Sequence, residues 1–145
     1  MSLNGAYDDG NIFAKILRGE APAAKVFEDD EVFAFMDVFP QGRGHTLVIS
    51  KESKARNLLE VEPAALEHLI LGVQRVARAV TAALKPDGVM IAQFNGQASG
   101  QSVFHLHFHI IPRWSGVPLK PHAGGPMADT AELAGLAREI AAMIS

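Results

Sequence analysis

Three of the chain's six histidines stand at alternate positions in the stretch FHLHFHIIPR, residues 104–113. A β-strand directs successive side chains to opposite faces, so His105, His107 and His109 would line one face of such a strand. The opposite face would be wholly apolar and would need a hydrophobic core. A row of imidazoles roughly 6.5–7 Å apart has no such packing role, so its residue type and spacing indicate chemistry.

Two kinds of chemistry compete for this row, beside the plain interpretation of an exposed strand face. His-x-His on a strand is a common pair of metal ligands, and His45 is a candidate for a further one. Three histidines on a straight strand span roughly 13–14 Å, however, which is too far for all of them to reach one ion. The alternative is nucleophilic catalysis, in which one imidazole attacks while its neighbours orient it or transfer protons.

The loop before the row favours the second alternative. Residues 99–102 read SGQS and join the predicted strand directly at Val103, two residues before His105. Gly100 allows the backbone to approach a ligand closely, and successive N–H groups with the Ser102 hydroxyl can hold phosphate oxygens. An anion held there would lie within reach of the nearest imidazoles.

Two longer segments resemble a known family. GQSVFHLHFHIIPR resembles the signature of the histidine triad (HIT) family of nucleotide hydrolases and transferases. IFAKILRGEAPAAKVFEDDEVFAFMDVFPQGRGHTLVISK resembles its N-terminal half, in the bacterial type of the nucleotide-binding (HINT-like) branch. Together the two segments cover roughly residues 11–113.

The resemblance implies a phosphoramidase-like nucleotide hydrolase. Such an enzyme attacks the α-phosphorus, forms a nucleotidyl-histidine intermediate and releases a nucleoside monophosphate such as AMP. The alternatives are a dinucleoside polyphosphate hydrolase, a nucleotidyl transferase and a non-catalytic nucleotide sensor. A metal enzyme is a further alternative, which a chelator would test.

The resemblance also implies a role for each matching histidine. His107 matches the nucleophile, whereas His105 and His109 match the flanking residues that bind phosphate oxygens and assist the leaving group. His45 matches an additional histidine that helps to fix the tautomer of the nucleophile. A partner for the second ring nitrogen of a nucleophilic histidine is physically expected.

The remaining site residues divide between phosphate and nucleoside. The expected phosphate-binding residues are Asn95, Gly100, Gln101 and Ser102, the last two through their backbone and the Ser102 hydroxyl. Asp37 matches the carboxylate that accepts hydrogen bonds from both ribose hydroxyls. The positions that match the apolar base pocket are Ile12, Phe13, Ile16 and Val38, and a preference for purines follows from the resemblance alone.

The sequence departs from many bacterial relatives at a structural zinc site. Those relatives carry Cys-x-x-Cys at the start of the N-terminal segment and a histidine after the strand that follows the Gly-His pair. Here the matching positions are Asn11, Ala14 and Ser53, and the chain contains no cysteine. We therefore expect no zinc site and no cofactor.

The sequence predicts an α+β fold, an antiparallel five-stranded sheet with helices on one face. A helix over residues 12–18 follows the N-cap Asn11, and AKVFEDDEVFAFMDV reads as a β-hairpin. HTLVIS is a third strand, and a long amphipathic helix runs from residues 62–63 to about residue 84. VMIAQFN and residues 103–111 are the last two strands, with Pro112 stopping the second. A final helix covers roughly residues 130–144.

The whole chain fits one domain of 145 residues. We expect a flexible N-terminal arm (residues 1–10), a HIT domain (residues 11–113), and a C-terminal loop and helix packed on it (residues 114–145), with His122 on a surface loop. A net charge of −3 gives no case for binding nucleic acid, and no run of about 18 apolar residues predicts a membrane span. We therefore expect a cytoplasmic protein, and the resemblance implies a purine nucleotide substrate as its partner. The resemblance implies a homodimer with sheets joined across its interface.

Overall fold

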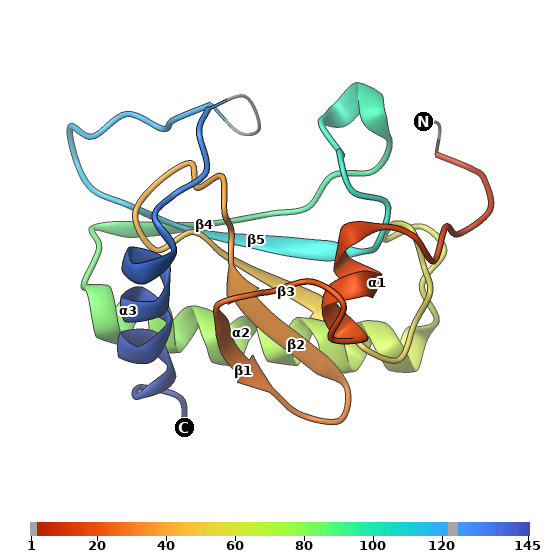
Figure 1. Cartoon of the computed structure of the whole chain (residues 1–145), viewed down its shortest axis with the longest axis horizontal. Coiled ribbons are helices and arrows are strands. Elements are labelled where there is room, and N and C mark those ends of the chain that lie inside the picture. The colour runs from red at the N-terminus through yellow and green to blue at the C-terminus, as the bar shows by residue number, and fades with distance from the viewer. Residues whose placement is uncertain (1–2, 122–124) are drawn as a thin grey trace.

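The computed structural model describes residues 3–121 and 125–145, so His122 lies outside the described residues. Five antiparallel strands form one sheet in the order β1-β2-β3-β5-β4. This is the predicted fold class. Figure 1 shows the sheet with its helices and with both ends of the chain at the periphery.

The N-terminal half follows its local sequence signals. Helix α1 (Ile12–Leu17) begins where the Asn11 side chain accepts a hydrogen bond from the Ala14 N–H at 3.0 Å. Strands β1 (Lys25–Glu28) and β2 (Val32–Met36) form the predicted hairpin, in whose turn the Asp29 carboxylate accepts from the Val32 N–H. Strand β3 (Thr46–Ser50) then pairs with β2.

The second half differs from the prediction at the histidine row. Helix α2 (Pro63–Leu84), strand β4 (Gly88–Ala92) and helix α3 (Thr130–Ala141) lie where expected. Strand β5 (His107–Arg113), however, begins four residues later than predicted and continues through Pro112. The ladder with β3 ends at Ile110, and Pro112 pairs only with Val89 of β4, so its missing N–H costs no hydrogen bond to β3. His105 therefore precedes the strand.

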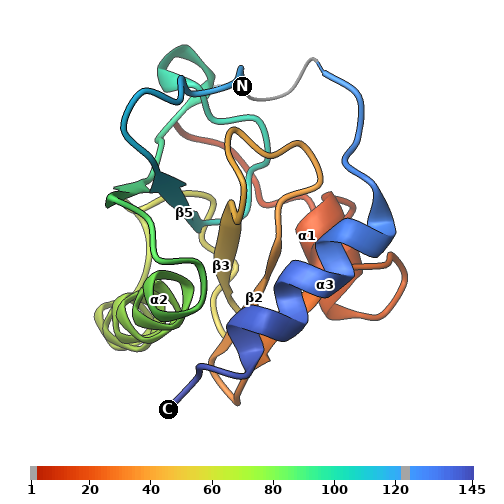
Figure 2. The same cartoon turned by 90° about the vertical axis from the view of Figure 1, so that its left-hand side faces the viewer.

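The helices cover both faces of the sheet, which corrects the expectation of helices on one face. One cluster joins Ala34 and Val48 of the sheet to α2 and α3. The other joins Phe13 of α1 to the side chains that alternate with those, such as Phe35 and Leu47. Figure 2 shows α1 and α2 on opposite sides of the strands. The histidines of β5 share the α1 face, since Leu47 pairs with His109.

Both ends of the chain contact the domain. In the C-terminal segment, the Ala128 N–H donates to the Val38 carbonyl at 2.9 Å, and the Lys120 N–H donates to the Gln41 carbonyl at 2.8 Å. In the segment expected as a flexible arm, the Leu3 carbonyl accepts from the Asn57 side chain at 3.1 Å. Among the described residues, none of the helices has the length and apolarity that crossing a membrane requires.

Candidate functional site

His107 is the first residue of β5, and a contact with the backbone determines which of its ring nitrogens carries the proton. Its Nδ1 lies 2.7 Å from the carbonyl oxygen of His105. A carbonyl can only accept, so Nδ1 carries the proton and Nε2 of the neutral ring keeps its lone pair. The ring of Phe13 packs edge-on against His107 at 4.9 Å between centroids. His107 is therefore held in the tautomer that a nucleophile at Nε2 requires.

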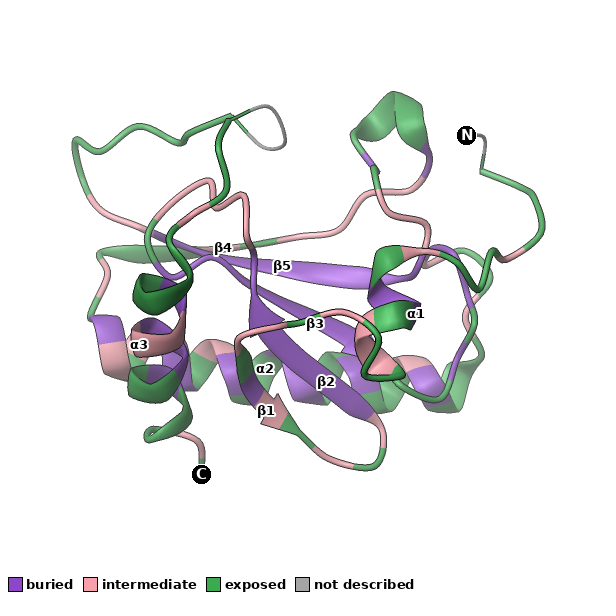
Figure 3. Ribbon diagram, in the orientation of Figure 1, coloured by how far each residue is buried: buried purple, intermediate pink, exposed green. Residues whose placement is uncertain are grey.

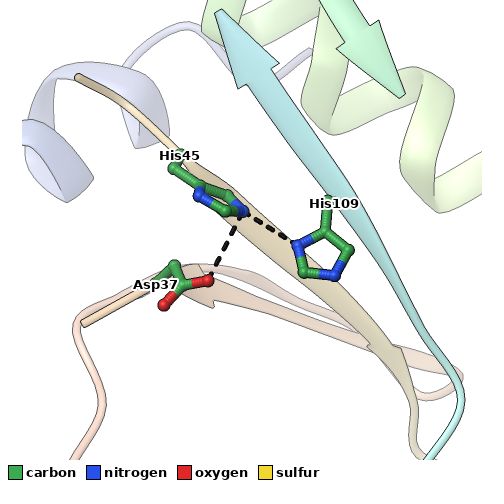
Figure 4. A group of neighbouring side chains, drawn as sticks. All are labelled: Asp37, His45 and His109. Atoms are coloured by element: carbon green, nitrogen blue, oxygen red, sulfur yellow. Dashed lines mark hydrogen bonds and ion pairs between the residues drawn. The ribbon is translucent and has the colours of Figure 1, made fainter. Parts of the chain in front are cut away.

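His109 belongs to a second chain of contacts, drawn in Figure 4. The Gln41 N–H donates to His45 Nδ1 at 3.0 Å, so the proton of His45 is on Nε2. That nitrogen lies 2.9 Å from His109 Nδ1 and 3.4 Å from Asp37 Oδ2. His109 Nδ1 therefore accepts, and the neutral ring carries its proton on Nε2. An imidazole N–H is a hydrogen-bond donor of the kind that a phosphate oxygen or a leaving group accepts.

His45 contacts His109, whereas the role expected for it concerned His107. We expected His45 to fix the tautomer of His107, but the His105 carbonyl has that role. The Nε2 of His45 instead donates to His109, and the two rings lie 5.1 Å apart between centroids. The register explains this contact, because His45 lies two residues before Leu47, the partner of His109, whereas His107 pairs with Ile49 further along β3. His109 is therefore the nearer of the two β5 histidines.

His105 does not have the phosphate-binding geometry expected for it. Its side chain is buried, its Nε2 donates to the Ser50 carbonyl at 2.9 Å, and its Nδ1 lies 2.7 Å from the Tyr7 hydroxyl. Both ring nitrogens are thus occupied within the protein. Burial lowers the pKa of the His105 imidazole, against a raising effect from the Ser50 carbonyl. His105 is therefore a neutral structural residue behind the nucleophile.

The expected phosphate-binding residues lie in the loop between β4 and β5, where some are exposed and others are buried or hydrogen-bonded within the protein. Gly100 has φ +111°, a conformation that favours glycine, and Ser102 is exposed beside it. Gln101 is buried, and its side chain accepts from the Gly96 N–H at 2.8 Å and donates to the Arg56 carbonyl at 2.7 Å.

The backbone N–H groups of Gly100 and Gln101 also donate within the loop, at 3.0 and 3.2 Å. The Gln101 N–H, expected to bind phosphate, thus has the Gly96 carbonyl as its partner here, and its phosphate-binding role stays a prediction. Asn95 holds the loop to the segment before α2, because its side-chain oxygen accepts from the Leu58 N–H at 3.0 Å. Gly100 and Ser102 are thus the exposed members of the expected phosphate-binding set.

The expected nucleoside-binding residues separate into two groups. Ile12, Phe13 and Ile16 lie on α1, and Phe13 and Ile16 pack with the cluster on the histidine face. Val38 packs with the cluster of the opposite face instead. Asp37 is buried, with Oδ1 accepting from the Phe39 N–H at 2.8 Å and Oδ2 beside His45. The structure thus joins the carboxylate to the histidines and removes Val38 from the group on α1.

The positions that match zinc ligands in relatives have structural contacts here. Asn11 caps α1, and the buried Ser53 hydroxyl accepts from the Ala55 N–H at 3.1 Å. A different set offers metal-ligand atoms within 4.8 Å of one another, namely Asp37, His45 and His109. The proton on His45 Nε2 is donated to His109 Nδ1, and Asp37 Oδ2 lies 3.4 Å from the same nitrogen.

Two aromatic residues at the site escaped sequence reasoning. The Tyr7 hydroxyl contacts His105, and the Phe94 ring lies edge-on to His109 at 5.4 Å between centroids. Tyr7 lies in a polar, unpatterned segment, and its being the chain's single tyrosine is the one signal that could have drawn attention to it.

Comparison with known proteins identifies the arrangement. The sequence profile of the HIT domain matches residues 18–116. A protein named Protein hit from Bacillus subtilis is 41% identical over 117 residues, which are 77% of this chain and 80% of that protein. Adenylylsulfatase HINT3 from Arabidopsis thaliana is 35% identical over 118 residues, covering 77% of this chain and 59% of that protein.

Solved structures agree with the sequence comparisons. The crystal structure of a Hit-like protein from Bartonella henselae matches with a TM-score of 0.89 and 46% identity. The match covers 97% of this chain and 100% of that one.

Proposed function

The chain belongs to the HIT domain family, and on that premise we propose that it hydrolyses nucleoside phosphoramidates or related nucleotide conjugates. Family members are nucleotide-binding proteins and are generally nucleotide hydrolases or transferases. The observation that supports catalysis most directly is the hydrogen bond of 2.7 Å between His107 Nδ1 and the His105 carbonyl. It places the proton of the neutral His107 ring on Nδ1, so that Nε2 carries the lone pair, which is the form a nucleophile needs.

In the proposed reaction, His107 Nε2 forms a bond to the α-phosphorus while the bond from phosphorus to the leaving group breaks. The Nε2 proton of His109 passes to the leaving group as that group departs, and Ser102 stabilises charge on the phosphoryl oxygens. Water then breaks the bond between phosphorus and His107, passes a proton to His109 and releases a nucleoside monophosphate such as AMP. The substrate proposed for this chain is a purine nucleotide conjugate.

The carboxylate of Asp37 has two roles in this proposal. It accepts hydrogen bonds from the ribose hydroxyls, and its Oδ2 atom, 3.4 Å from His45 Nε2, stabilises the proton that His45 shares with His109. Phe13, Ile16 and the exposed Ile12 supply the apolar side of the nucleoside site. Their position on α1, the helix on the histidine face, supports this role.

The first experiment measures AMP release from adenosine 5′-phosphoramidate in the presence of a chelator. We expect turnover by the unaltered protein, loss of turnover in His107→Ala, and normal turnover in His68→Ala. His68 is a matched control because it is an exposed histidine on α2 that contacts Glu52. Activity that disappears on chelation and returns with a divalent metal would instead favour a metal enzyme.

Two other substrates separate the remaining alternatives. Adenylyl sulfate is included because a relative bears the name adenylylsulfatase, and a dinucleoside polyphosphate tests the hydrolase of that class. If the protein binds AMP but releases it from none of these compounds, a nucleotide sensor replaces the enzyme as the proposed function.

A homodimer is proposed from the outer edge of the sheet. Strand β4 is an edge strand, and its Val89 and Ile91 side chains are exposed. Figure 3 shows β4 as exposed beside the buried β5. Together with Ile70 and Ala77 of α2, these side chains line an apolar groove. Pairing of β4 with β4 of a second copy would satisfy the free edge and cover the groove.

A further inference from the structure

Two contacts hold the N-terminal segment against the residues before α2. The Leu3 carbonyl accepts from the Asn57 side chain at 3.1 Å. Beyond Tyr7, the Asp9 carboxylate lies 3.1 Å from Lys54 Nζ, and that ammonium stands 5.9 Å from the centre of the Tyr7 ring. The contact of Leu3 anchors the segment before Tyr7, whereas the ion pair after Tyr7 joins two exposed side chains and holds the segment only weakly.

The hydroxyl of Tyr7 completes the hydrogen bonding of His105. Because the Ser50 carbonyl can only accept, His105 Nε2 carries the proton of the neutral ring. Nδ1 is then an acceptor, and Tyr7 donates to it over 2.7 Å. With its side chain 2% exposed, His105 has little water to replace this donor. A buried acceptor without a donor costs free energy of folding. Loss of the Tyr7 hydroxyl would therefore favour a different orientation of the His105 ring.

The position of His105 is transmitted to the nucleophile by its backbone. Its carbonyl accepts from His107 Nδ1, and the Phe13 ring lies against both imidazoles, 6.4 Å from His105 and 4.9 Å from His107 between centroids. His105 precedes β5, whose ladder with β3 starts at His107. The peptide group of this carbonyl is also held from its other end, because the Leu106 N–H donates to the Ala55 carbonyl at 3.0 Å. The His105 ring is therefore the second anchor of the carbonyl, on the side of the chain that precedes it.

We propose that Tyr7 is a positioning residue for the nucleophile His107 and acts through His105. The Tyr7 hydroxyl fixes the ring and hence the carbonyl of His105. That carbonyl keeps the His107 proton on Nδ1 and aims Nε2 at the substrate. The N-terminal segment is then a working part of the active site. The kinetic consequence rests on the hydrolase activity proposed above, whereas the hydrogen-bond chain is measurable without substrate.

The test compares Tyr7→Phe with the unaltered protein, using adenosine 5′-phosphoramidate as the probe. This change removes one oxygen atom and keeps the ring beside Lys54. We expect kcat to fall about tenfold, less than the roughly hundredfold loss that a 1 Å displacement of a reacting group can cause. KM should stay within about twofold because Tyr7 does not touch the substrate in this proposal.

A matched control loosens the segment but retains the hydroxyl. Asp9 lies two residues after Tyr7 in the chain, and Asp9→Asn weakens its exposed ion pair with Lys54. We expect its kcat to remain close to that of the unaltered protein. An equal loss of kcat in Asp9→Asn and Tyr7→Phe would overturn the proposal, because general order of the segment would then explain both.

Nuclear magnetic resonance of the ring nitrogens supplies a readout that folding alone does not move. In the unaltered protein, His107 should show a protonated Nδ1 and an unprotonated Nε2. In Tyr7→Phe, we expect the two signals to approach each other as tautomers exchange. Because Tyr7 is the chain's single tyrosine, a label at its Cζ reports this one hydroxyl.

The two proposals fail in distinguishable ways. A chain that does not turn over the probe contradicts the proposed substrate, but the nitrogen signals of His107 still decide the role of Tyr7. Unchanged His107 signals and an unchanged kcat in folded Tyr7→Phe would overturn the positioning role.

Discussion

At the scale of the residue, the histidines differ chiefly in what their second nitrogen contacts. His105 is buried, and that burial lowers its pKa, so it stays neutral at neutral pH. His68 is exposed, and a hydrogen bond from its ring to Glu52 raises its pKa. The same side chain is thus kept neutral in one place and stabilised as a cation in another.

This contrast predicts the order of titration. In a histidine NMR titration, the midpoint of His105 should lie below the ordinary value of about 6.5, and that of His68 above it. Because the folded-state pKa of His105 is lower than in the unfolded chain, its contribution to stability is complete above about pH 6.5. That contribution is lost as the pH falls through the folded-state value. A His105 midpoint at or above that of His68 would contradict the assignment.

The carboxylate of Asp37 allows a second prediction at this scale. Its Oδ2 atom lies 3.4 Å from His45 Nε2, so Asp37→Asn removes the charge that stabilises the proton shared with His109. We expect kcat to fall about tenfold, which corresponds to about 1.4 kcal/mol. The loss should also occur with a 2′-deoxy substrate, since the contact with His45 does not involve ribose. A loss confined to the ribose substrate would leave Asp37 with ribose binding alone.

The sequence revealed these residues better than it revealed their partners. Alternation singled out His105, His107 and His109 because side-chain direction in an extended chain follows from local geometry. The neutral, buried state of His105 depends on Ser50 and Tyr7, which lie 55 and 98 positions away in the chain. Such contacts come from the tertiary fold and have no local pattern to announce them.

At the scale of the element, the turn before β3 positions His45. Gly44 has φ +87°, and a Cβ atom there would collide with Leu84 Cδ1 and lie 3.1 Å from Pro112 Cγ. Gly44→Ala should therefore lower the free energy of unfolding by about 2–4 kcal/mol, measured by urea denaturation. Gly88→Ala is the control, because a Cβ there meets nothing within 4 Å. Equal stability of the two variants would refute this account of the turn.

The elements were predictable where local signals are strong. The cap at Asn11 and the 22-residue helix α2 follow from capping and periodicity. The start of β5 was predicted too early because the alternation of side chains extends back to Val103. Val103 lies outside the strand and packs with the cluster that contains Phe13 of α1. The face occupied by α1 was also wrong, since a helix of six residues contains too little pattern to choose between two apolar faces of a sheet.

At the scale of the whole molecule, segments near both ends of the chain contact residues of the candidate site or its neighbours. Tyr7 contacts His105, and the C-terminal segment bonds to the loop that follows Asp37, through Ala128 and Val38. In Figure 1 the N-terminal segment and the loop between β4 and β5 lie at the same end of the sheet. The ends of this domain therefore help to shape its site, and changes at either end are expected to affect activity.

The edge of the sheet formed by β4, next to β5, carries the last prediction. The predicted apolar stripe of α2 is only partly buried within one copy, since Ile70 is 44% exposed beside Ile91 of β4 at 43%. Sedimentation should show a dimer of the unaltered protein. Ile91→Asp should raise the dissociation constant at least about thirtyfold, because a central apolar contact contributes about 2 kcal/mol or more.

Leu59→Asp is the matched control for this substitution. Leu59 is 70% exposed and lies outside the groove, so the same new charge there should leave the dimer intact. A monomer at all concentrations in the unaltered protein would contradict pairing through β4, and dissociation of both variants would show that added charge alone is responsible. If only Ile91→Asp dissociates and it still releases AMP, then each copy holds a complete active site, as the contacts of His107 within one chain predict.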